Sequence, residues 1–265
     1  MAFLHSNAQQ PTQATFRDDL IARLRAAKIP AEWVGLTANT WARSFSPDLA
    51  NWLAQAPYTE LDRRLSRDEL RKFCARDDVP VEFRVAAVMA WGRSNPRNPR
   101  NNQNLWASVA NIVPLLKRLP TLTRKQAFSE FRLLVATSAL KGMRASFFTK
   151  LMFFFGCQGA YILDQWMAKS VLALWAANWS TGADEQPTFV RSAGHFVRLG
   201  YGGTSIDLTM SENDYEKYCI ALESLTEPLG RSDGADVELW LFSEPKSEWR
   251  QFLRALNWKR KPEYV

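Results

Sequence analysis

The chain contains few residues that could bind a metal ion or form disulfides. It has three cysteines, Cys74, Cys157 and Cys219, and two histidines, His5 and His195. The cysteines lie far apart and show no CxxC spacing, which disfavours both a zinc site and a disulfide framework. We therefore expect a protein with no metal and no cofactor, in a reducing compartment such as the cytoplasm.

Long apolar segments and a secretory leader are also missing. The longest uncharged apolar run, residues 151–163, is shorter than the roughly 20 residues that a transmembrane helix needs. The first residues, MAFLHSNAQQPTQ, lack the basic and apolar regions of a secretory signal. We expect a protein with no membrane association.

Tryptophan and positive charge, in contrast, are abundant. The 265 residues include 11 tryptophans, and 34 basic against 27 acidic side chains give a net charge of +7. Tryptophans fill a protein interior or provide flat surfaces on which other rings stack. The positive charge favours a polyanionic partner such as nucleic acid, although many basic proteins bind none.

Apolar residues follow helical spacing along most of the chain. Helices are expected within residues 15–30, 46–57, 66–78, 81–92, 103–120, 123–140, 146–155 and 165–179, from near Ser211, and in two segments separated near Pro245. Ser46, and Ser211 with Asp214, are suited to begin helices. The chain has no internal repeat and no long linker, so we expect one all-α, or nearly all-α, unit spanning residues 1–265.

The most apolar segment, LKGMRASFFTKLMFFFGCQGAYILD at residues 140–164, also contains cations. Lys141 and Arg144 flank Gly142, where a left-handed turn between two helices is easily made. The second helix is expected to begin near Ser146, whose hydroxyl can cap it. Its free N–H groups and dipole would favour a phosphate. The alternative is an ordinary glycine helix end beside two solvated cations.

These residues resemble the helix-hairpin-helix DNA glycosylases, most closely their bacterial 8-oxoguanine-glycosylase-like branch, which includes anti-phage glycosylases. The family hairpin reads Leu-x-Gly-apolar-Gly, and this chain matches it at Leu140, Gly142 and Met143, with Arg144 replacing the second glycine. The resemblance implies two helical lobes with a DNA-binding cleft between them. It also implies a monomer that binds double-stranded DNA containing a modified base, in the cytoplasm of a bacterium and associated with the nucleoid.

The same resemblance suggests how the chain divides. Residues 1–92 would form the N-terminal helical lobe, residues 93–104 a basic loop, and residues 105–265 the hairpin lobe with the C-terminal helices. The hairpin residues Lys141 to Arg144, with Ser146, would bind a DNA phosphate. In the loop, Arg93, Arg97 and Arg100 would bind further phosphates; a solvated loop is the alternative.

Asp164 corresponds to the family's catalytic aspartate, after a loop that keeps Gly156 and Gly159 but has no proline. Cleavage of an N-glycosidic bond builds positive charge on the sugar, which a carboxylate stabilises. An aspartate before QWMAKSV is also an ordinary helix N-cap. Bifunctional members carry a lysine near Ser146; here the nearest is Lys150, one turn later in apolar surroundings that would lower its pKa. Hydrolysis by water without the lysine therefore stays open.

A flipped base needs aromatic side chains to stack on. Trp166, Trp249 and Phe252 are the candidates, although such residues commonly belong to a core. The expected substrate is a bulky modified cytosine of phage DNA, such as glucosylated hydroxymethylcytosine, excised in anti-phage defence, and 8-oxoguanine is the alternative. Two other hypotheses remain: a helix-hairpin-helix protein that binds DNA without catalysis, and an unrelated all-α protein whose partner is another protein.

Overall fold

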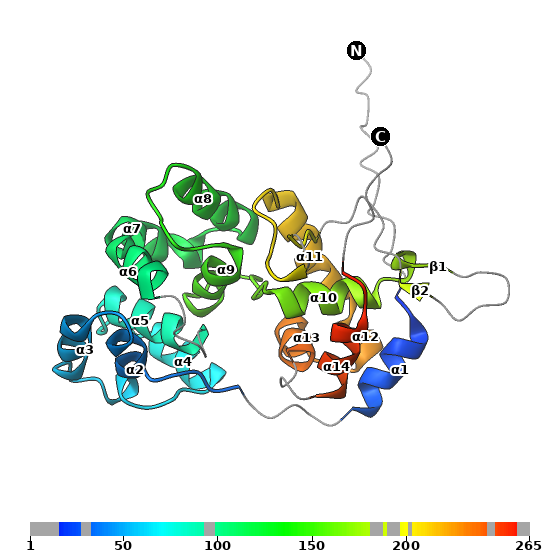
Figure 1. The fold of residues 1–265 in the computed structure, drawn as a ribbon, viewed down its shortest axis with the longest axis horizontal. Helices are drawn as coiled ribbons and strands as arrows, with labels where there is room; N and C mark the ends of the chain where they lie inside the picture. The colour runs from blue at the N-terminus through cyan, green and yellow to red at the C-terminus, as the bar shows by residue number, and fades with distance from the viewer. Residues whose placement is uncertain are drawn as a thin grey trace, which may run out of the picture.

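A computed structural model describes residues 16–27, 33–92, 99–180, 188–189, 197–200, 203–242 and 247–258. In these residues regular structure is almost entirely helical (Figure 1). The exception is an antiparallel pair of two-residue strands, β1 (Trp179–Ser180) and β2 (Thr188–Phe189). The expected all-α class is thereby confirmed. None of the described helices is long and apolar enough to cross a bilayer.

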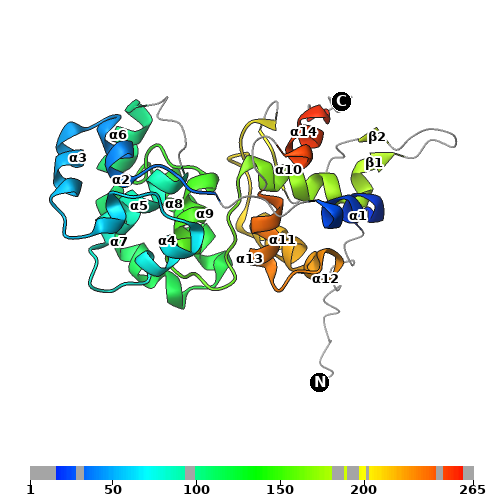
Figure 2. The same cartoon turned by 90° about the horizontal axis from the view of Figure 1, so that it is seen from below.

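The helices form two groups, seen side by side in both views (Figures 1 and 2). The first group contains α2 (Ala38–Arg43), α3 (Pro47–Ala54), α4 (Arg67–Cys74), α5 (Val81–Gly92), α6 (Pro99–Ala107), α7 (Val109–Arg118), α8 (Arg124–Ala136) and α9 (Ala145–Phe154). The second contains α1 (Asp18–Ala26), α10 (Gln165–Leu174), α11 (Glu212–Ser224), α12 (Thr226–Leu229), α13 (Gly234–Leu241) and α14 (Glu248–Ala255). Helix α1, the first helix of the described residues, packs against α12 and so belongs to the second group, whereas α2 to α9 form the first.

Helices that are apolar around their circumference lie at the centre. Every residue of α5 from Val85 to Trp91 is buried, because α2, α7 and α9 pack around it. In α10 every residue from Met167 to Leu174 is buried, against α11, α13 and α14. The short segment from the end of α9 to the start of α10 joins the two groups.

Several predicted helix starts are confirmed. Ser46 accepts a hydrogen bond from the backbone N–H of Leu49 at 3.3 Å, with Pro47 as the first helical residue of α3. Ser211 and Asp214 form a reciprocal capping box at the start of α11. These short polar side chains satisfy N–H groups that have no partner within the helix.

The single helix expected over residues 103–120 was wrong. The chain instead forms α6 and α7, which are separated at Ser108. The Ser108 hydroxyl donates to the carbonyl of Asn104 at 2.8 Å, a contact of the kind that bends helices, and accepts from the N–H of Lys141 at 3.1 Å. Ser108 thus ties this bend to the hairpin that follows α8.

The helix expected over residues 165–179 is shorter than predicted, because α10 ends at Leu174. Asn178 donates to the carbonyl of Leu172, and the Trp179 indole donates to the carbonyl of Ala173, both at 2.8 Å. These side-chain donors satisfy two carbonyl groups that backbone N–H groups would bond if the helix continued. The expected break between α13 and α14 is present; Pro245 itself lies outside the described residues.

Candidate active site

A cavity of about 300 Å³ lies between the two helix groups. The first group contributes Trp33, Gly92, Ser146, Phe147 and Lys150. The second side consists of Asp164, Gln165, Trp166, Thr204, Ser205, Phe242 and Arg250. The structure therefore brings Asp164, Lys150, Ser146 and Trp166 of the sequence prediction to one cavity.

Asp164 is the N-cap of α10. Its Oδ1 accepts hydrogen bonds from the backbone N–H groups of Trp166 at 2.8 Å and Met167 at 3.0 Å. Its Oδ2 accepts no hydrogen bond from any described residue. One oxygen thus fixes the carboxylate on the helix, while the other is available to a bound molecule, at a position where the helix dipole favours negative charge.

The backbone before Asp164 is held by buried tyrosines from α11. The Tyr215 hydroxyl accepts from the N–H of Tyr161 at 3.1 Å and lies 2.7 Å from the carbonyl of the same residue, to which it donates. The Tyr218 hydroxyl donates to the carbonyl of Ile162 at 2.7 Å. An extended segment buried in a helical protein needs such partners, because no neighbouring strand provides them.

Two further side chains complete this support. The N–H of Ile162 donates to Oε2 of Glu238, and the N–H of Leu163 donates to the hydroxyl of Thr149, both at 3.1 Å. Thr149 lies on α9 and Glu238 on α13, so both helix groups position the residues that lead into Asp164.

Lys150 lies on α9 with only 4% of its surface exposed. Its Nζ donates to the carbonyl of Ser146 at 2.7 Å. Burial lowers the pKa of the Lys150 amine, and the charges of Asp164 and Glu238 partly oppose that shift. The lysine stem fits beside Gly92, where a Cβ atom would lie 2.9 Å from Lys150 Cδ.

The hairpin differs from its prediction in length. Helix α8 ends at Ala136 and Ser138 has a left-handed φ of 59°, so the connection is residues 137–144 rather than four residues. Gly142 does adopt a left-handed φ, of 72°. It also packs closely on α6: a Cβ there would meet the carbonyl oxygen of Asn101 at 2.7 Å, and the Asn101 amide donates to the Gly142 carbonyl at 3.0 Å.

No side chain of the described residues caps the start of α9. Arg144, not Ser146, is its N-cap residue, so the prediction that the Ser146 hydroxyl caps this helix was wrong. Met143 is buried and anchors the turn, whereas Lys141 and Arg144 are exposed beside it. The first N–H groups of α9 therefore lie next to two cations without a capping side chain from the described residues.

The remaining predicted residues lie elsewhere. Arg100 is exposed on α6, and Arg93 and Arg97 lie outside the described residues. Trp249 is buried, and its indole donates to the Ser170 hydroxyl at 3.0 Å; Phe252 packs on Trp249, with ring centres 5.2 Å apart. Neither aromatic residue lines the cavity.

The sequence interpretation missed most of the cavity wall. Trp33 and Phe242 meet edge to face across the two groups, with ring centres 5.8 Å apart. The Arg250 guanidinium lies 4.4 Å from the centre of the Trp166 ring and 5.3 Å from that of Phe242. A signal for Arg250 was present, because it is a charged residue on the buried face of an amphipathic helix.

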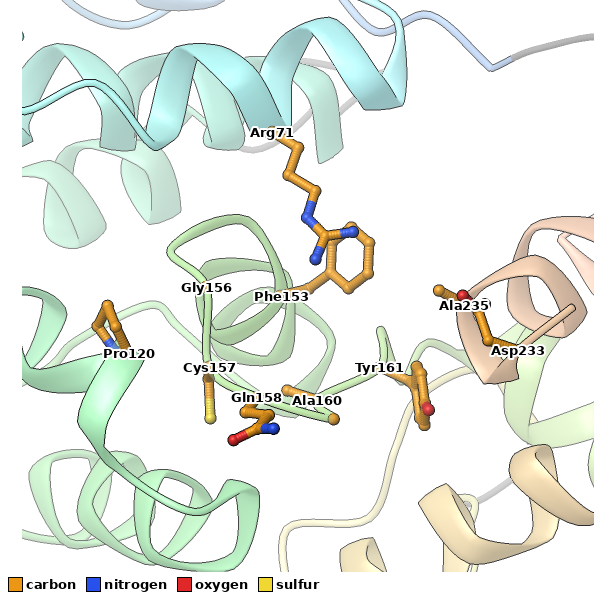
Figure 3. Close-up of a pocket in the computed structure, with 11 residues that line it drawn as sticks. Arg71, Pro120, Phe153, Gly156, Cys157, Gln158, Ala160, Tyr161, Asp233 and Ala235 are labelled. Carbon is orange, nitrogen blue, oxygen red and sulfur yellow. The ribbon is translucent and has the colours of Figure 1, made fainter.

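A second hollow, of about 460 Å³, lies at the C-terminal end of α9 (Figure 3). Arg71 extends over the ring of Phe153 at 5.3 Å, above the loop at residues 156–161, with Asp233 and Ala235 at the side. Neither Asp164 nor Lys150 lines this hollow. Of the two cavities, only the first therefore contains the catalytic candidates.

A family model described as "Putative 8-oxoguanine DNA glycosylase OGG-like protein" matches residues 27–242. The match includes the hairpin, Lys150 and Asp164, and stops before Arg250. Neither the curated proteins nor the solved structures contain a match to this chain.

Proposed function

The chain belongs to the OGG-like 8-oxoguanine DNA glycosylase family, and on that premise we propose that it excises a modified base from double-stranded DNA. The observation that carries the proposal is the shared cavity of Asp164 and Lys150, which is lined by aromatic residues and lies between two helix groups. A duplex base can reach such a cavity only when it is rotated out of the stack.

Asp164 would carry the cleavage step. As the bond from the sugar C1′ to the base nitrogen breaks, its electron pair leaves with the base and C1′ becomes positively charged. The free oxygen of Asp164 would stabilise that charge and accept a proton from the attacking water. The water oxygen bonds to C1′, the base takes up a proton, and the products are an abasic site and a free base.

Lys150 offers a second nucleophile in place of water. A neutral amine can attack C1′ while the electron pair of the glycosidic bond leaves with the base, which takes up a proton. The C1′–O4′ bond then opens, O4′ takes up a proton, and the lysine nitrogen forms an imine with C1′. Loss of a proton from C2′ then eliminates the 3′ phosphate and cuts the strand. The lowered pKa of this buried amine supports that role, because it raises the neutral fraction near neutral pH. Hydrolysis by water is the alternative, and it leaves Lys150 as a charge near the sugar.

The hairpin would bind the DNA backbone. The start of α9 combines a helix N-terminus without a side-chain cap and the exposed cations Lys141 and Arg144. Ser146, in the first turn of α9, also lines the cavity. A phosphate bound at this turn would therefore lie close to the nucleotide being processed. Arg93, Arg97 and Arg100 are proposed as further phosphate contacts.

The volume and the aromatic lining of the cavity favour a flat base as the primary substrate. Its volume of about 300 Å³ is at the lower end of ligand pockets, and Trp33, Phe147, Trp166 and Phe242 provide aromatic walls. An oxidised purine such as 8-oxoguanine suits these features. A glucosylated hydroxymethylcytosine, in anti-phage defence, is the second candidate, because the hydroxyls of Thr204 and Ser205 could bind a sugar.

The test is release of free base, detected by mass spectrometry, from duplexes that contain 8-oxoguanine, alkylated purines, uracil or glucosylated hydroxymethylcytosine. Release from one duplex above all others would identify both the reaction and the substrate. Tight DNA binding without release from any duplex would favour a DNA-binding protein without catalysis. Weak binding that disappears with salt would favour a protein partner.

A further inference from the structure

Three cationic side chains surround the ring of Trp166. Their charged centres lie 4.8 Å (Lys169), 4.4 Å (Arg250) and 5.4 Å (Arg254) from the centre of that ring. The Lys169 amine also lies 5.3 Å from the ring centre of Trp258. Cation–π contact stabilises each charge individually, but does nothing to reduce the repulsion among them.

Two of the three cations are buried, Arg254 is exposed, and no acidic group of the described residues lies within ion-pair distance of them. Lys169 is 7% exposed and Arg250 is 6% exposed. Among the residues that the structure describes, none of the three cations forms an ion pair. Arg250 Nε is buried without a hydrogen-bond partner among the described residues. Buried charges in proteins are normally paired, so this arrangement calls for an anion that the chain does not itself supply.

Burial, together with the charges of neighbouring cations, lowers the pKa of both Lys169 and Arg250. Burial, and then the charges of Arg254 and Arg250, lower the pKa of Lys169. Burial lowers the pKa of Arg250 to about 10, although the charge of Asp164 acts in the opposite direction. A bound anion would reverse both effects.

The cluster adjoins the cavity that contains Asp164. Arg250 and Trp166 line that cavity. Gly203, with a left-handed φ of 69°, covers Lys169 so closely that a Cβ would lie 3.3 Å from Lys169 Cε. The next two residues, Thr204 and Ser205, line the cavity. One short segment therefore connects the cations to the place where the flipped nucleotide would lie.

We propose that Lys169, Arg250 and Arg254 form an anion site that binds a DNA backbone phosphate flanking the flipped nucleotide. The proposal rests on the proposed function, and its site is separate from the one at the start of α9. Arginine presents a planar fork of donors that fits phosphate oxygens, and lysine adds a point charge. The phosphate would hold the nucleotide's sugar in place while Asp164 acts on it.

The test compares Lys169→Met with Lys217→Met, which removes an exposed lysine from α11 and controls for the loss of one charge. Binding is measured by fluorescence anisotropy at several salt concentrations, with a duplex that carries a tetrahydrofuran abasic analogue. Lys169→Met is expected to weaken binding about tenfold and to reduce the slope of log K against log salt by about 0.9. Its melting temperature should equal or exceed that of the wild type.

Unchanged affinity and slope in Lys169→Met would overturn the proposal. A lower melting temperature would show that Lys169 supports the fold, and Arg254→Gln, at an exposed position, then decides: weaker DNA binding by this variant supports the site, and unchanged binding overturns it. If inorganic phosphate raises the wild-type melting temperature while Lys169→Met leaves the affinity for DNA unchanged, the site binds free phosphate and the assignment to DNA is wrong.

The proposed reaction is tested separately on the same preparations. If the wild type releases no base while Lys169→Met alters binding as expected, the phosphate site stands and the glycosylase proposal fails. If the wild type releases base and Lys169→Met binds the abasic duplex normally, the reaction stands and the phosphate site fails.

Discussion

Arg67 on α4 and Glu238 on α13 form a buried bidentate ion pair that joins the two helix groups. Their nitrogen and oxygen atoms meet at 3.1 and 2.6 Å, and the two side chains are 7% and 1% exposed. The same carboxylate accepts from the N–H of Ile162, two residues before Asp164. The pair therefore connects the packing of the two groups with the position of the proposed catalytic carboxylate.

Removing one partner of this pair should be more damaging than removing both. Arg67→Met or Glu238→Leu alone leaves a buried charge without its partner, and each should lower the free energy of unfolding by about 3–5 kcal/mol. The double variant Arg67→Met/Glu238→Leu leaves neither charge and should lose clearly less than the sum of the two. Urea denaturation of the four proteins gives these values; additive losses would contradict the account.

Gly142 and Gly230 offer a matched test of the hairpin. Both have left-handed φ, 72° and 64°, but a Cβ at Gly230 meets nothing within 4 Å, whereas at Gly142 it meets the Asn101 carbonyl oxygen at 2.7 Å. Gly230→Ala should cost about 1 kcal/mol from backbone strain alone. Gly142→Ala should cost more, and should also weaken DNA binding. Equal losses of unfolding free energy would show that contact with α6 is not important.

Lys150 can be tested as a nucleophile by trapping with borohydride. If its amine forms the imine, wild-type protein becomes covalently linked to substrate DNA, and the yield rises with pH around a midpoint below 10.5, the ordinary lysine value, because burial lowers this pKa. Lys150→Met should abolish the adduct, and Lys125→Met, at an exposed lysine of α8, should retain it. An adduct that persists in Lys150→Met would assign the nucleophile to another amine. Base release without any wild-type adduct would indicate water.

The lowered pKa of Lys169 predicts a pH-dependent stability difference in the absence of DNA. Between the native pKa and the unfolded value of 10.5, the unfolded chain binds more protons than the native chain, so wild-type stability rises with pH over that range. Lys169→Met lacks this term. The variant should therefore be the more stable protein below the native pKa of Lys169. The difference in unfolding free energy between the variant and the wild type should then decrease as pH rises towards 10.5. If the unfolding free energies of the two proteins change in parallel with pH, the inference that Lys169 is destabilised as a buried cation would be contradicted.

Local features were predictable from the sequence because local chemistry determines them. Ser46, Ser211 and Asp164 begin helices as their side chains suggested. Ser146 failed as a cap because the turn ends two residues earlier than expected, at Arg144, and the hydroxyl lies inside the helix. That boundary depends on how the turn packs against α6, which is remote in the sequence.

The candidate site was predictable only in part. Lys150 was predictable because it is a cation within an apolar helix. Lys169 and Arg250 are also cations on buried helix faces, and the same pattern predicts the cluster around Trp166. In contrast, nothing local indicates that Trp33 meets Phe242, since only the packing of two distant segments brings them together.

The most direct test of the account is single-turnover base release by Asp164→Asn, with protein in excess over the duplex found to be the substrate. Asparagine also caps helices, so this variant should fold and bind DNA like the wild type, whereas Asp164→Ala loses about 1 kcal/mol of cap energy. Asp233→Asn makes the same change at the N-cap of α13 and serves as the control. The account predicts that only Asp164→Asn loses release, by at least about a hundredfold. Release at the wild-type rate from a folded Asp164→Asn would show that Asp164 is a helix cap and nothing more.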